Sequence, residues 1–317
     1  MRFDSRSRVS TLVSAWMPTG DETPQGVAGY FGGGQDSTYI SGIDKITFSA
    51  DTKTTLSATL TTARDLAAGM ANSGTAGYFG GGTDPNNLSG IDKITFPADT
   101  KTTLVATLTS ARTELAAMAD SGTAGYFGGG EGSGGNISGI DKITFPADTK
   151  STLSATLTSA RRRLAGMANS GTAGYFGGGF TTVRVSGIDK ITFSGDTKST
   201  LSATLTSART VRAGMANSGT AGYFGGGNDG SNISGIDKIT FSDDTKSTLS
   251  ATLTTARDLA AGFANSGVAG YFGGGYDTAD ISGIDKITFV ADTKSTLSAT
   301  LTTARRNLAG FADSGVL

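Results

Sequence analysis

The 317-residue sequence predicts an all-β fold, a six-bladed β-propeller with four-stranded blades, and three observations carry this prediction. First, the segment Gly-Tyr-Phe-Gly-Gly-Gly occurs six times, at intervals of 48 or 49 residues. Second, each copy is followed by Ser-Gly-Ile-Asp-Lys-Ile-Thr-Phe and then by an Ala-Arg pair. Third, each interval holds four short segments of strand character separated by turn residues. Radial repetition of such units leaves only short, protected strand edges, as in a propeller.

Each repeat is expected to supply four strands, which in the second repeat cover residues 66–72, 75–80, 91–96 and 102–108. The first of these segments is built from small residues and Met, which suits an innermost strand because six such strands crowd around one axis. The second and third contain Tyr78, Phe79 and Ile94, residue types that favour a packed sheet surface. Asn-Ser-Gly, the Gly-rich run and Pro-Ala-Asp mark the turns between them.

Two other repeat architectures share a comparable period. Paired helices of the HEAT type are excluded because Gly-Gly-Gly, Ser-Gly and Asn-Ser-Gly interrupt any helical pattern in every copy. A β-solenoid is the weaker competitor, since its rungs are shorter and two would be needed in each repeat.

The register of the repeats predicts that the chain ends close the ring without a covalent bond. Residues 26–30 form a second strand with no first strand before them, whereas residues 306–317 supply one first strand and then end. We therefore expect residues 26–317 to form the propeller, with the last strand completing the first blade. A truncation of residues 306–317 is expected to open it.

Residues 1–25 lie outside the repeat and are predicted to be an N-terminal arm. This arm contains the only Trp of the sequence, Trp16, together with Arg2, Arg6 and Arg8. Part of it resembles a decayed outer strand, so it is free to reach another molecule, and we expect it to dock the propeller onto assembly partners. A disordered terminus is the alternative.

Composition excludes several classes of function. The sequence has no Cys and no His, which removes thiol and imidazole catalysis and Cys/His zinc sites. Its 26 Lys+Arg and 27 Asp+Glu leave a formal net charge of -1, so no nucleic-acid partner is expected. No apolar run reaches the length of a membrane span, and no membrane insertion is expected. We expect no cofactor and no resident metal.

The order of features resembles that of kelch-type β-propellers: an Arg, an inner strand, an aromatic followed by a Gly run (residues 78–82), then two outer strands. The resemblance covers residues 26–317. It departs at the Trp of the kelch outer strand, which is Leu in every repeat here (Leu56, Leu104, Leu153, Leu201, Leu249 and Leu297). More loosely, the repeats resemble those of virion and tail-associated proteins of bacteriophages, which implies location in the virion. A cytoplasmic location is the alternative.

Residues that are the same in all six repeats are expected to maintain the fold rather than to bind a ligand. Tyr30 and Phe31 point to opposite faces of their strand and are expected to pack toward both neighbouring blades. Asp44 and Lys45 recur six times, whereas a catalytic centre needs one asymmetric arrangement, so we expect them to be solvated charges in weak pairs. Arg64 and its equivalents are expected to tie a corner to a carbonyl or carboxylate group.

Positions that vary between repeats fall in two windows. The first window follows the Gly run and comprises residues 35–40, 83–88, 131–137, 180–185, 228–233 and 276–281. The second window follows the repeated Arg and comprises residues 65–67, 113–115, 162–164, 210–212, 258–260 and 306–308. In antiparallel blades both windows emerge on one side, so they are expected to share one face. Their variation reflects either recognition of a ligand or sequence drift in unconstrained loops.

Aromatic and Arg side chains in these windows are candidate contacts, since both types anchor interfaces. They are Tyr39, Phe180, Tyr276, Arg162, Arg163, Arg184, Arg212 and Arg306. Four repeats share an Asp in the first window: Asp36, Asp84, Asp229 and Asp277. We expect these Asp residues to stabilise turns, with a calcium site near Asp277 and Asp280 as the alternative.

These observations favour a non-enzymatic structural and recognition module. It is expected to bind a partner protein or a host-surface glycan through the variable windows. The alternatives are a carbohydrate-active enzyme on the same fold, which would show one pocket with perturbed carboxylates, and an intracellular kelch-like adaptor.

Overall fold

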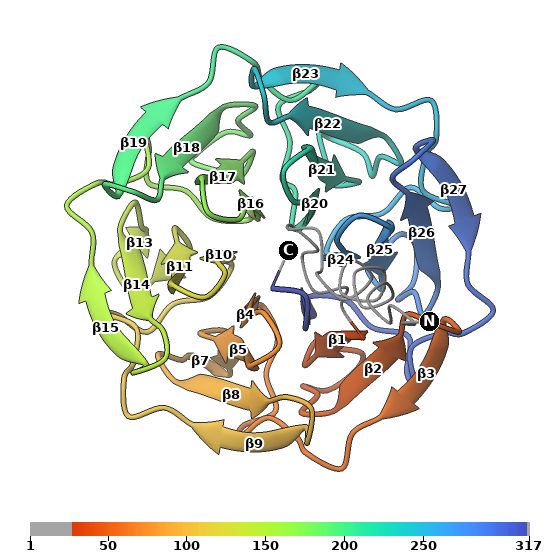
Figure 1. Ribbon diagram of the computed structural model, residues 1–317, viewed down its shortest axis with the longest axis horizontal. Helices are drawn as coiled ribbons and strands as arrows, with labels where there is room; N and C mark the ends of the chain where they lie inside the picture. Colours follow the sequence, from red (N-terminus) through yellow and green to blue (C-terminus); the bar gives the residue numbers. More distant parts are fainter. Residues whose placement is uncertain (1–26, 316–317) are drawn as a thin grey trace, which may run out of the picture.

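In the computed structural model, the six repeats form six four-stranded antiparallel sheets arranged in a ring around one axis (Figure 1). The structure describes residues 27–315. We number the blades in the chain order of their second strands, so that blade 1 has the strand order β28-β1-β2-β3 and blade 2 the order β4-β5-β8-β9. The predicted six-bladed, all-β fold is confirmed.

From the axis outwards, every blade presents an inner, a second, a third and an outer strand. The inner strands are β28 (Ala309–Ala312), β4 (Ala68–Asn72), β10 (Ala116–Asp120), β16 (Ala165–Asn169), β20 (Ala213–Asn217) and β24 (Ala261–Asn265). The second strands are β1 (Ala28–Gly32), β5 (Ala76–Gly80), β11 (Ala124–Gly128), β17 (Ala173–Gly177), β21 (Ala221–Gly225) and β25 (Ala269–Gly273).

The third and outer strands complete the blades. The third strands are β2 (Ile43–Thr47), β8 (Ile91–Thr95), β14 (Ile140–Thr144), β18 (Ile188–Thr192), β22 (Ile236–Thr240) and β26 (Ile284–Thr288). The outer strands are β3 (Thr52–Thr55), β9 (Thr100–Thr103), β15 (Thr149–Thr152), β19 (Thr197–Thr200), β23 (Thr245–Thr248) and β27 (Thr293–Thr296). Two small hairpins, β6 (Thr83–Asp84) with β7 (Asn86–Asn87) and β12 (Glu131–Gly132) with β13 (Gly135–Asn136), lie in loops.

The ends of the described chain close the ring. Strand β28 pairs antiparallel with β1, with Tyr30 opposite Phe311. The Asp313 carboxylate accepts hydrogen bonds from the backbone N–H groups of Val27 at 2.7 Å and Ala28 at 3.1 Å. The expected non-covalent closure, in which the last strand completes the first blade, is therefore confirmed.

The outer strand of each blade ends earlier than expected. In blade 2 it covers residues 100–103, whereas the sequence predicts residues 102–108. Thr109 donates hydrogen bonds from its backbone N–H and its hydroxyl to Asp141 of blade 3, at 2.9 and 2.6 Å. The chain after β9 thus crosses to the next blade, and contacts with that blade override the strand propensity of the segment.

Aromatic side chains of the second strands fill the spaces between blades. The Tyr78 ring stacks on Phe145 of the following blade with centroids 5.1 Å apart. The Phe79 ring packs in the opposite direction, on Phe311 of the preceding blade, with centroids 4.6 Å apart. The prediction that these neighbouring rings pack toward both adjacent blades is confirmed, and the core consists of six such aromatic layers.

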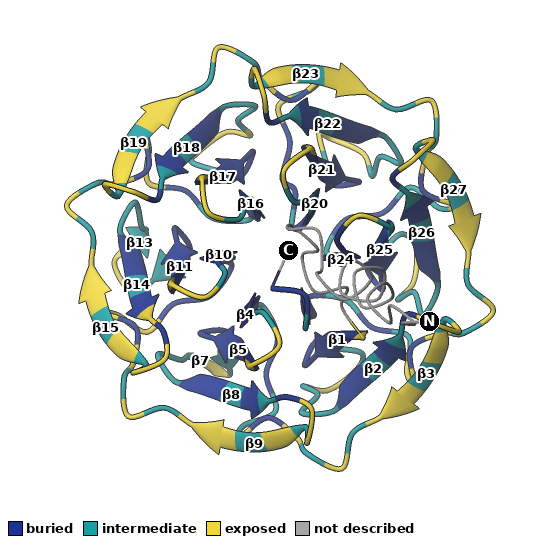
Figure 2. Ribbon diagram, viewed as in Figure 1, coloured by how far each residue is buried: buried dark blue, intermediate teal, exposed yellow. Residues whose placement is uncertain are grey.

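Small residues of the inner strands allow the close approach at the axis. A Cβ atom at Gly69 would collide with the carbonyl oxygen of Gly310 on the neighbouring inner strand. Burial follows the same radial order, because the inner strands are buried and the outer strands exposed (Figure 2). The described residues contain no helix that is long and apolar enough to cross a membrane.

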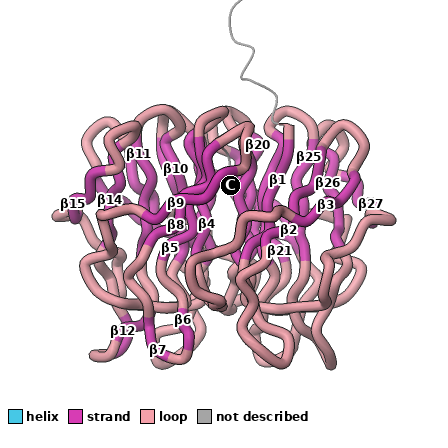
Figure 3. The backbone as a smooth tube through the Cα atoms, turned by 90° about the horizontal axis from the view of Figure 1, so that it is seen from below, coloured by secondary structure: helices cyan, strands magenta, loops and turns pink. Residues whose placement is uncertain are grey.

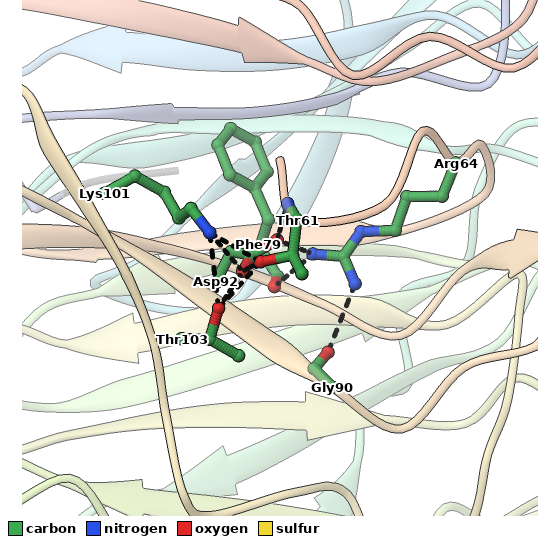
Figure 4. Close-up of polar contacts among 7 residues, drawn as sticks. All are labelled: Thr61, Arg64, Phe79, Gly90, Asp92, Lys101 and Thr103. Atoms are coloured by element: carbon green, nitrogen blue, oxygen red, sulfur yellow. Dashed lines mark hydrogen bonds and ion pairs between the residues drawn. The ribbon is translucent and has the colours of Figure 1, made fainter. Parts of the chain in front are cut away.

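The repeated Arg links the corner between two blades to the next sheet (Figure 4). The Arg64 Nη2 atom donates to Asp92 Oδ2 at 2.7 Å and to the Phe79 carbonyl oxygen at 3.3 Å. Both charged side chains are buried, with 3% and 1% of their surface exposed. The expectation that this Arg ties the corner to a carbonyl or carboxylate group is confirmed.

The same carboxylate collects further donors from the chain that enters the blade. The Thr61 backbone N–H and hydroxyl donate to Asp92 at 2.9 and 2.6 Å, and the Thr103 hydroxyl donates at 2.8 Å. The Lys101 ammonium lies 3.9 Å from Asp92 Oδ1. Each Asp of the repeated Asp-Lys pair is therefore a buried centre of an interblade network rather than a surface charge.

This burial corrects the expectation that the Asp-Lys pairs are solvated. All six Asp side chains are buried: Asp44, Asp92, Asp141, Asp189, Asp237 and Asp285. The neighbouring Lys is half-buried and bridges two blades, as Lys93 does by lying 2.7 Å from Asp148 Oδ2. Sequence reasoning missed the network because its partners lie about thirty to fifty-five residues apart along the chain.

Candidate binding site on the variable face

The two variable windows lie together at one end of the ring. Each second window is joined to a first window by an antiparallel bridge, as between Asp65 and Thr83 and between Arg162 and Phe180. The small strands β6, β7 and β12 mark this end, opposite the turns between inner and second strands (Figure 3). The prediction that both windows share one face is confirmed, and we call this end the variable face.

A belt of backbone hydrogen bonds surrounds the axis at the variable face. The middle residue of every second window except that of blade 6 donates its N–H to the carbonyl oxygen of its counterpart in the preceding blade, for example Glu114 to Leu66 at 3.1 Å and Arg163 to Glu114 at 2.9 Å. These residues have positive φ angles, 56° at Glu114 and 54° at Arg163. The belt therefore fixes the backbone positions from which the variable side chains project.

Blade 5 interrupts this belt. Its middle residue is Val211, and a β-branched residue avoids a positive φ angle. Its side chain instead fills the space beside Gly178, where an added Cβ would lie 2.7 Å from Val211 Cγ1. The next N–H of the belt, that of Leu259, donates to Asp258 Oδ1 at 2.8 Å in place of a backbone carbonyl.

Arg212, which follows Val211, lies at the axis. Its counterparts in the other repeats are Ala or Leu: Ala67, Leu115, Leu164, Ala260 and Leu308. Arg212 lines a central cavity of about 40 Å³ together with the small residues of the inner strands. Its Nη1 atom lies 3.4 Å from Asn307 Oδ1 in blade 1, and burial lowers the pKa of its guanidinium.

One pocket on the variable face brings four of the predicted contact residues together. It lies between blades 4 and 5 and has a volume of about 220 Å³. Its lining residues are Arg162, Arg163, Phe180, Arg184, Thr210, Asn228 and Asp258. The lining comes from three successive repeats, which gives a combination of side chains that no single repeat carries.

Two of the pocket's Arg side chains are held by acidic neighbours. The Arg163 Nε atom donates to Glu114 Oε1 at 2.8 Å, and Arg162 forms ion pairs with both Glu114 and Glu131. The Arg162 guanidinium also covers the Phe180 ring, with its central carbon 5.5 Å from the ring centroid. These contacts hold both guanidiniums in place beside the pocket.

Arg184 is held by a neutral partner instead. Its Nε and Nη2 atoms donate to the backbone oxygen and the side-chain Oδ1 of Asn228, at 3.0 and 2.7 Å. Three other blades carry Asn at this position, and Asn87 and Asn232 also donate to a carbonyl oxygen of the next blade, each at 3.1 Å. Arg184 therefore keeps the interblade link of the repeat and adds a positive charge.

Arg184 and Arg212 differ from the other cations of the described chain. Each of the other Lys and Arg side chains within residues 27–315 has a carboxylate oxygen within 4.0 Å. Arg184 and Arg212 have no such partner among those residues. Within residues 27–315, the cations without such an ion pair are thus Arg184 at the pocket and Arg212 at the axis. The charges of Glu114, Asp258 and Asp65 still raise the pKa of Arg212.

Asp258 forms the acidic wall of the pocket. Its Oδ2 atom accepts a hydrogen bond from the Thr210 hydroxyl at 3.1 Å, and its Oδ1 atom accepts from the Leu259 N–H. Burial raises the pKa of the Asp258 carboxyl, an effect that hydrogen bonds and Arg212 partly offset. Sequence reasoning missed Asp258, Thr210 and Asn228, although all three lie in the variable windows.

The remaining predicted contacts lie outside this pocket. The Arg306 guanidinium stacks on Tyr276 with its central carbon 4.9 Å from the ring centroid, and pairs with Asp280 at 3.1 Å. Tyr39 is half-buried and bridges to Gln35 in blade 1. The predicted docking residues of the arm, Arg2, Arg6, Arg8 and Trp16, lie outside the described residues.

Of the four Asp residues expected to stabilise turns, Asp36 does so, whereas Asp277 accepts a hydrogen bond from Asn232 of the preceding blade at 3.3 Å. Asp36 Oδ1 accepts a hydrogen bond from the Thr38 N–H at 2.8 Å, which confirms the expected turn role in blade 1. Asp280, half of the alternative calcium site, is instead the ion-pair partner of Arg306. In the part of the chain that the structure describes, no group of three acidic side chains is arranged to hold a metal ion.

The chain was compared with protein-family models and with curated proteins. No protein-family model matches it, and no curated protein matches it. The four-stranded blades and the six-fold ring are consistent with a kelch-type repeat fold.

Proposed function

We propose that this protein is a non-enzymatic recognition module that binds its partner through the variable face. One observation carries the proposal: Arg162, Arg163, Phe180 and Arg184 converge on one pocket. Aromatic and Arg side chains in a partly enclosed pocket are the usual anchors of a binding interface. The invariant remainder of each repeat supplies a rigid support.

The scaffold supports this proposal because its loops are already ordered. The bridges between windows and the backbone belt fix the loops before a ligand arrives. Binding then costs little conformational entropy, which is the advantage of a pre-organised site. Variation among the six repeats changes the side chains of the face without changing the fold beneath it.

For the biological setting, we propose a structural protein of a phage particle, related in its fold to kelch-type propellers. The support is the resemblance of the repeats to those of kelch propellers and of virion and tail-associated proteins. In this setting the arm of residues 1–25 docks onto other assembly proteins, and the variable face meets a host-surface glycan or protein. Immunogold electron microscopy of a producing culture tests the setting, because label on cytosol alone would exclude a virion location and favour an adaptor.

A glycan array combined with substitutions tests recognition by the variable face. Phe180→Thr introduces the residue that Thr83 supplies in blade 2, so it removes the aromatic anchor and keeps a side chain that the repeat tolerates. Tyr39→Ala and Tyr276→Ala probe the rest of the face, and Lys246→Gln on the outer rim is the control. Binding that none of the face variants reduces would contradict the proposal.

A carbohydrate-active enzyme is the second candidate, and Asp258 is the observation that favours it. A buried carboxyl with a raised pKa in a pocket matches a general acid. Glycoside hydrolysis ordinarily requires a second carboxyl, and Asp258 is the acidic residue that lines this pocket. Incubation with any glycan bound on the array, followed by product analysis, decides between binding and turnover.

A further inference from the structure

We infer that the pocket between blades 4 and 5 binds a carboxylated sugar, with the carboxylate on Arg184 and Arg163 and the hydroxyl groups on Asp258, Asn228 and Thr210. This inference rests on the proposed recognition function and names the class of ligand.

The pocket contains a positive charge that forms no ion pair with the described residues. Arg184 lines the pocket and has no carboxylate oxygen within 4.0 Å in the described chain. A guanidinium binds a carboxylate through two parallel hydrogen bonds, which are stronger than neutral ones. An anionic group of a ligand would give Arg184 the ion-pair partner that no described residue supplies.

The guanidinium donors of the pocket are held in place by neighbouring residues. Asn228 holds the Nε and Nη2 atoms of Arg184, which leaves Nη1 without a partner among the described residues. Arg163 donates from its Nε atom to Glu114, and its two terminal nitrogens have no hydrogen-bond partner within residues 27–315, so they remain for a ligand. Free donors on guanidiniums that are already held in place bind an anion with little loss of side-chain freedom.

The wall opposite these donors favours a sugar over an acidic peptide side chain. Asp258, Asn228 and Thr210 line the pocket. The Thr210 hydroxyl donates to Asp258 and the Asn228 amide donates to Asn232, so these residues offer a ligand mainly oxygen acceptors. The hydroxyl groups of a sugar ring would pair with them, whereas an Asp or Glu side chain carries only its carboxylate. Asp258 also repels a dianion more than a monoanion, so a carboxylate suits the pocket better than a phosphate.

The volume of the pocket suits a single sugar ring. A volume of about 220 Å³ is below the range of about 300–1,000 Å³ that is usual for drug-sized ligands. One sugar ring with its carboxylate is a ligand of this scale. A longer glycan would extend from the pocket over the loops of blades 4 and 5.

The test compares two ligands that differ in one group, methyl glucuronide and methyl glucoside, by NMR titration of the full chain. We expect the glucuronide to bind at least tenfold more tightly than the glucoside. Arg184→Asn should remove most of that difference. This variant introduces the residue of Asn87, Asn136 and Asn232, so it keeps the interblade link and an unchanged thermal midpoint serves as the folding control. Lys246→Gln removes one positive charge from the outer rim and should leave both affinities unchanged.

Three outcomes would overturn the inference and leave the proposed function standing. They are equal binding of both sugars, a glucuronide affinity that Arg184→Asn does not change, and selective binding of an acidic peptide in place of the glucuronide. If neither sugar binds but another glycan on the array does, the ligand class is wrong and recognition by the face survives. If the array, the sugars and the acidic peptide all fail to bind, the proposed function fails as well.

Discussion

The Tyr271 hydroxyl of blade 6 donates a hydrogen bond to Asp51 of blade 1, with the two oxygens 2.8 Å apart across the junction of the ring. The same contact joins each other pair of neighbouring blades, for example Tyr78 with Asp148 at 2.8 Å. At the junction Lys286 also lies 2.7 Å from Asp51. The non-covalent junction therefore repeats the interblade contacts made within the continuous chain.

Removing residues 306–317 should open the ring. The truncated chain loses β28 and the Phe311 side chain, which is fully buried between blades 1 and 2. Loss of a buried Phe alone costs about 3–5 kcal/mol. We expect the thermal midpoint, followed by circular dichroism, to fall by many degrees or the transition to lose its cooperativity. A truncated chain with the full-length midpoint would disprove closure by β28.

Replacing one repeated Asp should destabilise the fold strongly. Asp141→Ala leaves Arg112 buried and without its ion-pair partner, which lies 2.8 Å from it. An unpaired buried charge typically costs about 3–5 kcal/mol. Urea denaturation measures this loss in the free energy of unfolding. Lys150→Gln, which removes a half-exposed cation 3.9 Å from the same Asp, is the matched control and should cost less than about 1 kcal/mol.

Two Gly→Ala substitutions should differ sharply in their effect. At Gly69 a Cβ atom meets the carbonyl oxygen of Gly310, a backbone atom that cannot move aside. Overpacking of this kind costs about 1–3 kcal/mol or more. At Gly90 a Cβ atom meets nothing within 4 Å. We expect Gly69→Ala to lower the free energy of unfolding and Gly90→Ala to leave it nearly unchanged; equal effects would contradict the packing at the axis.

Acid should weaken the interblade networks. Burial raises the pKa of the Asp189 and Asp237 carboxyls. Hydrogen bonds from neighbouring Thr residues and the charges of Arg161 and Arg209 together outweigh burial and leave each pKa below its ordinary value. A carboxyl with a lowered folded-state pKa stabilises the fold fully above its unfolded pKa of about 3.9, and this contribution is lost as the pH falls through the folded value. The free energy of unfolding should thus fall below about pH 4.

Comparison with a variant isolates this effect from other carboxyls. Burial raises the pKa of Asp65, Asp258 and Asp313, which contribute a pH dependence of opposite sign. Asp189→Asn removes one carboxyl of the lowered class, so its free energy of unfolding should depend less steeply on pH between about 4 and 2 than that of the wild type. Identical slopes in urea titrations at a series of pH values would contradict the assignment.

The sequence by itself determined the architecture of this protein. Six copies of one segment, small residues in the inner strands and paired Tyr-Phe rings in the second strands specify the number of blades and the direction in which the core packs. Their spacing also placed the variable windows on one face. These features could be predicted because they depend on local periodicity and residue size, which each repeat carries in full.

Only the tertiary structure decided how charged groups are used. The buried networks around Asp92 and its equivalents, the contact of Arg212 with Asn307, and the pocket around Arg184 all join residues from different repeats. A buried charge and a solvated charge look the same in a sequence, because burial depends on which neighbouring blade covers the side chain. Arg162, Arg163, Phe180 and Arg184 all lie in blade 4. The ring geometry completes the pocket by placing Thr210 and Asn228 of blade 5 and Asp258 of blade 6 beside them.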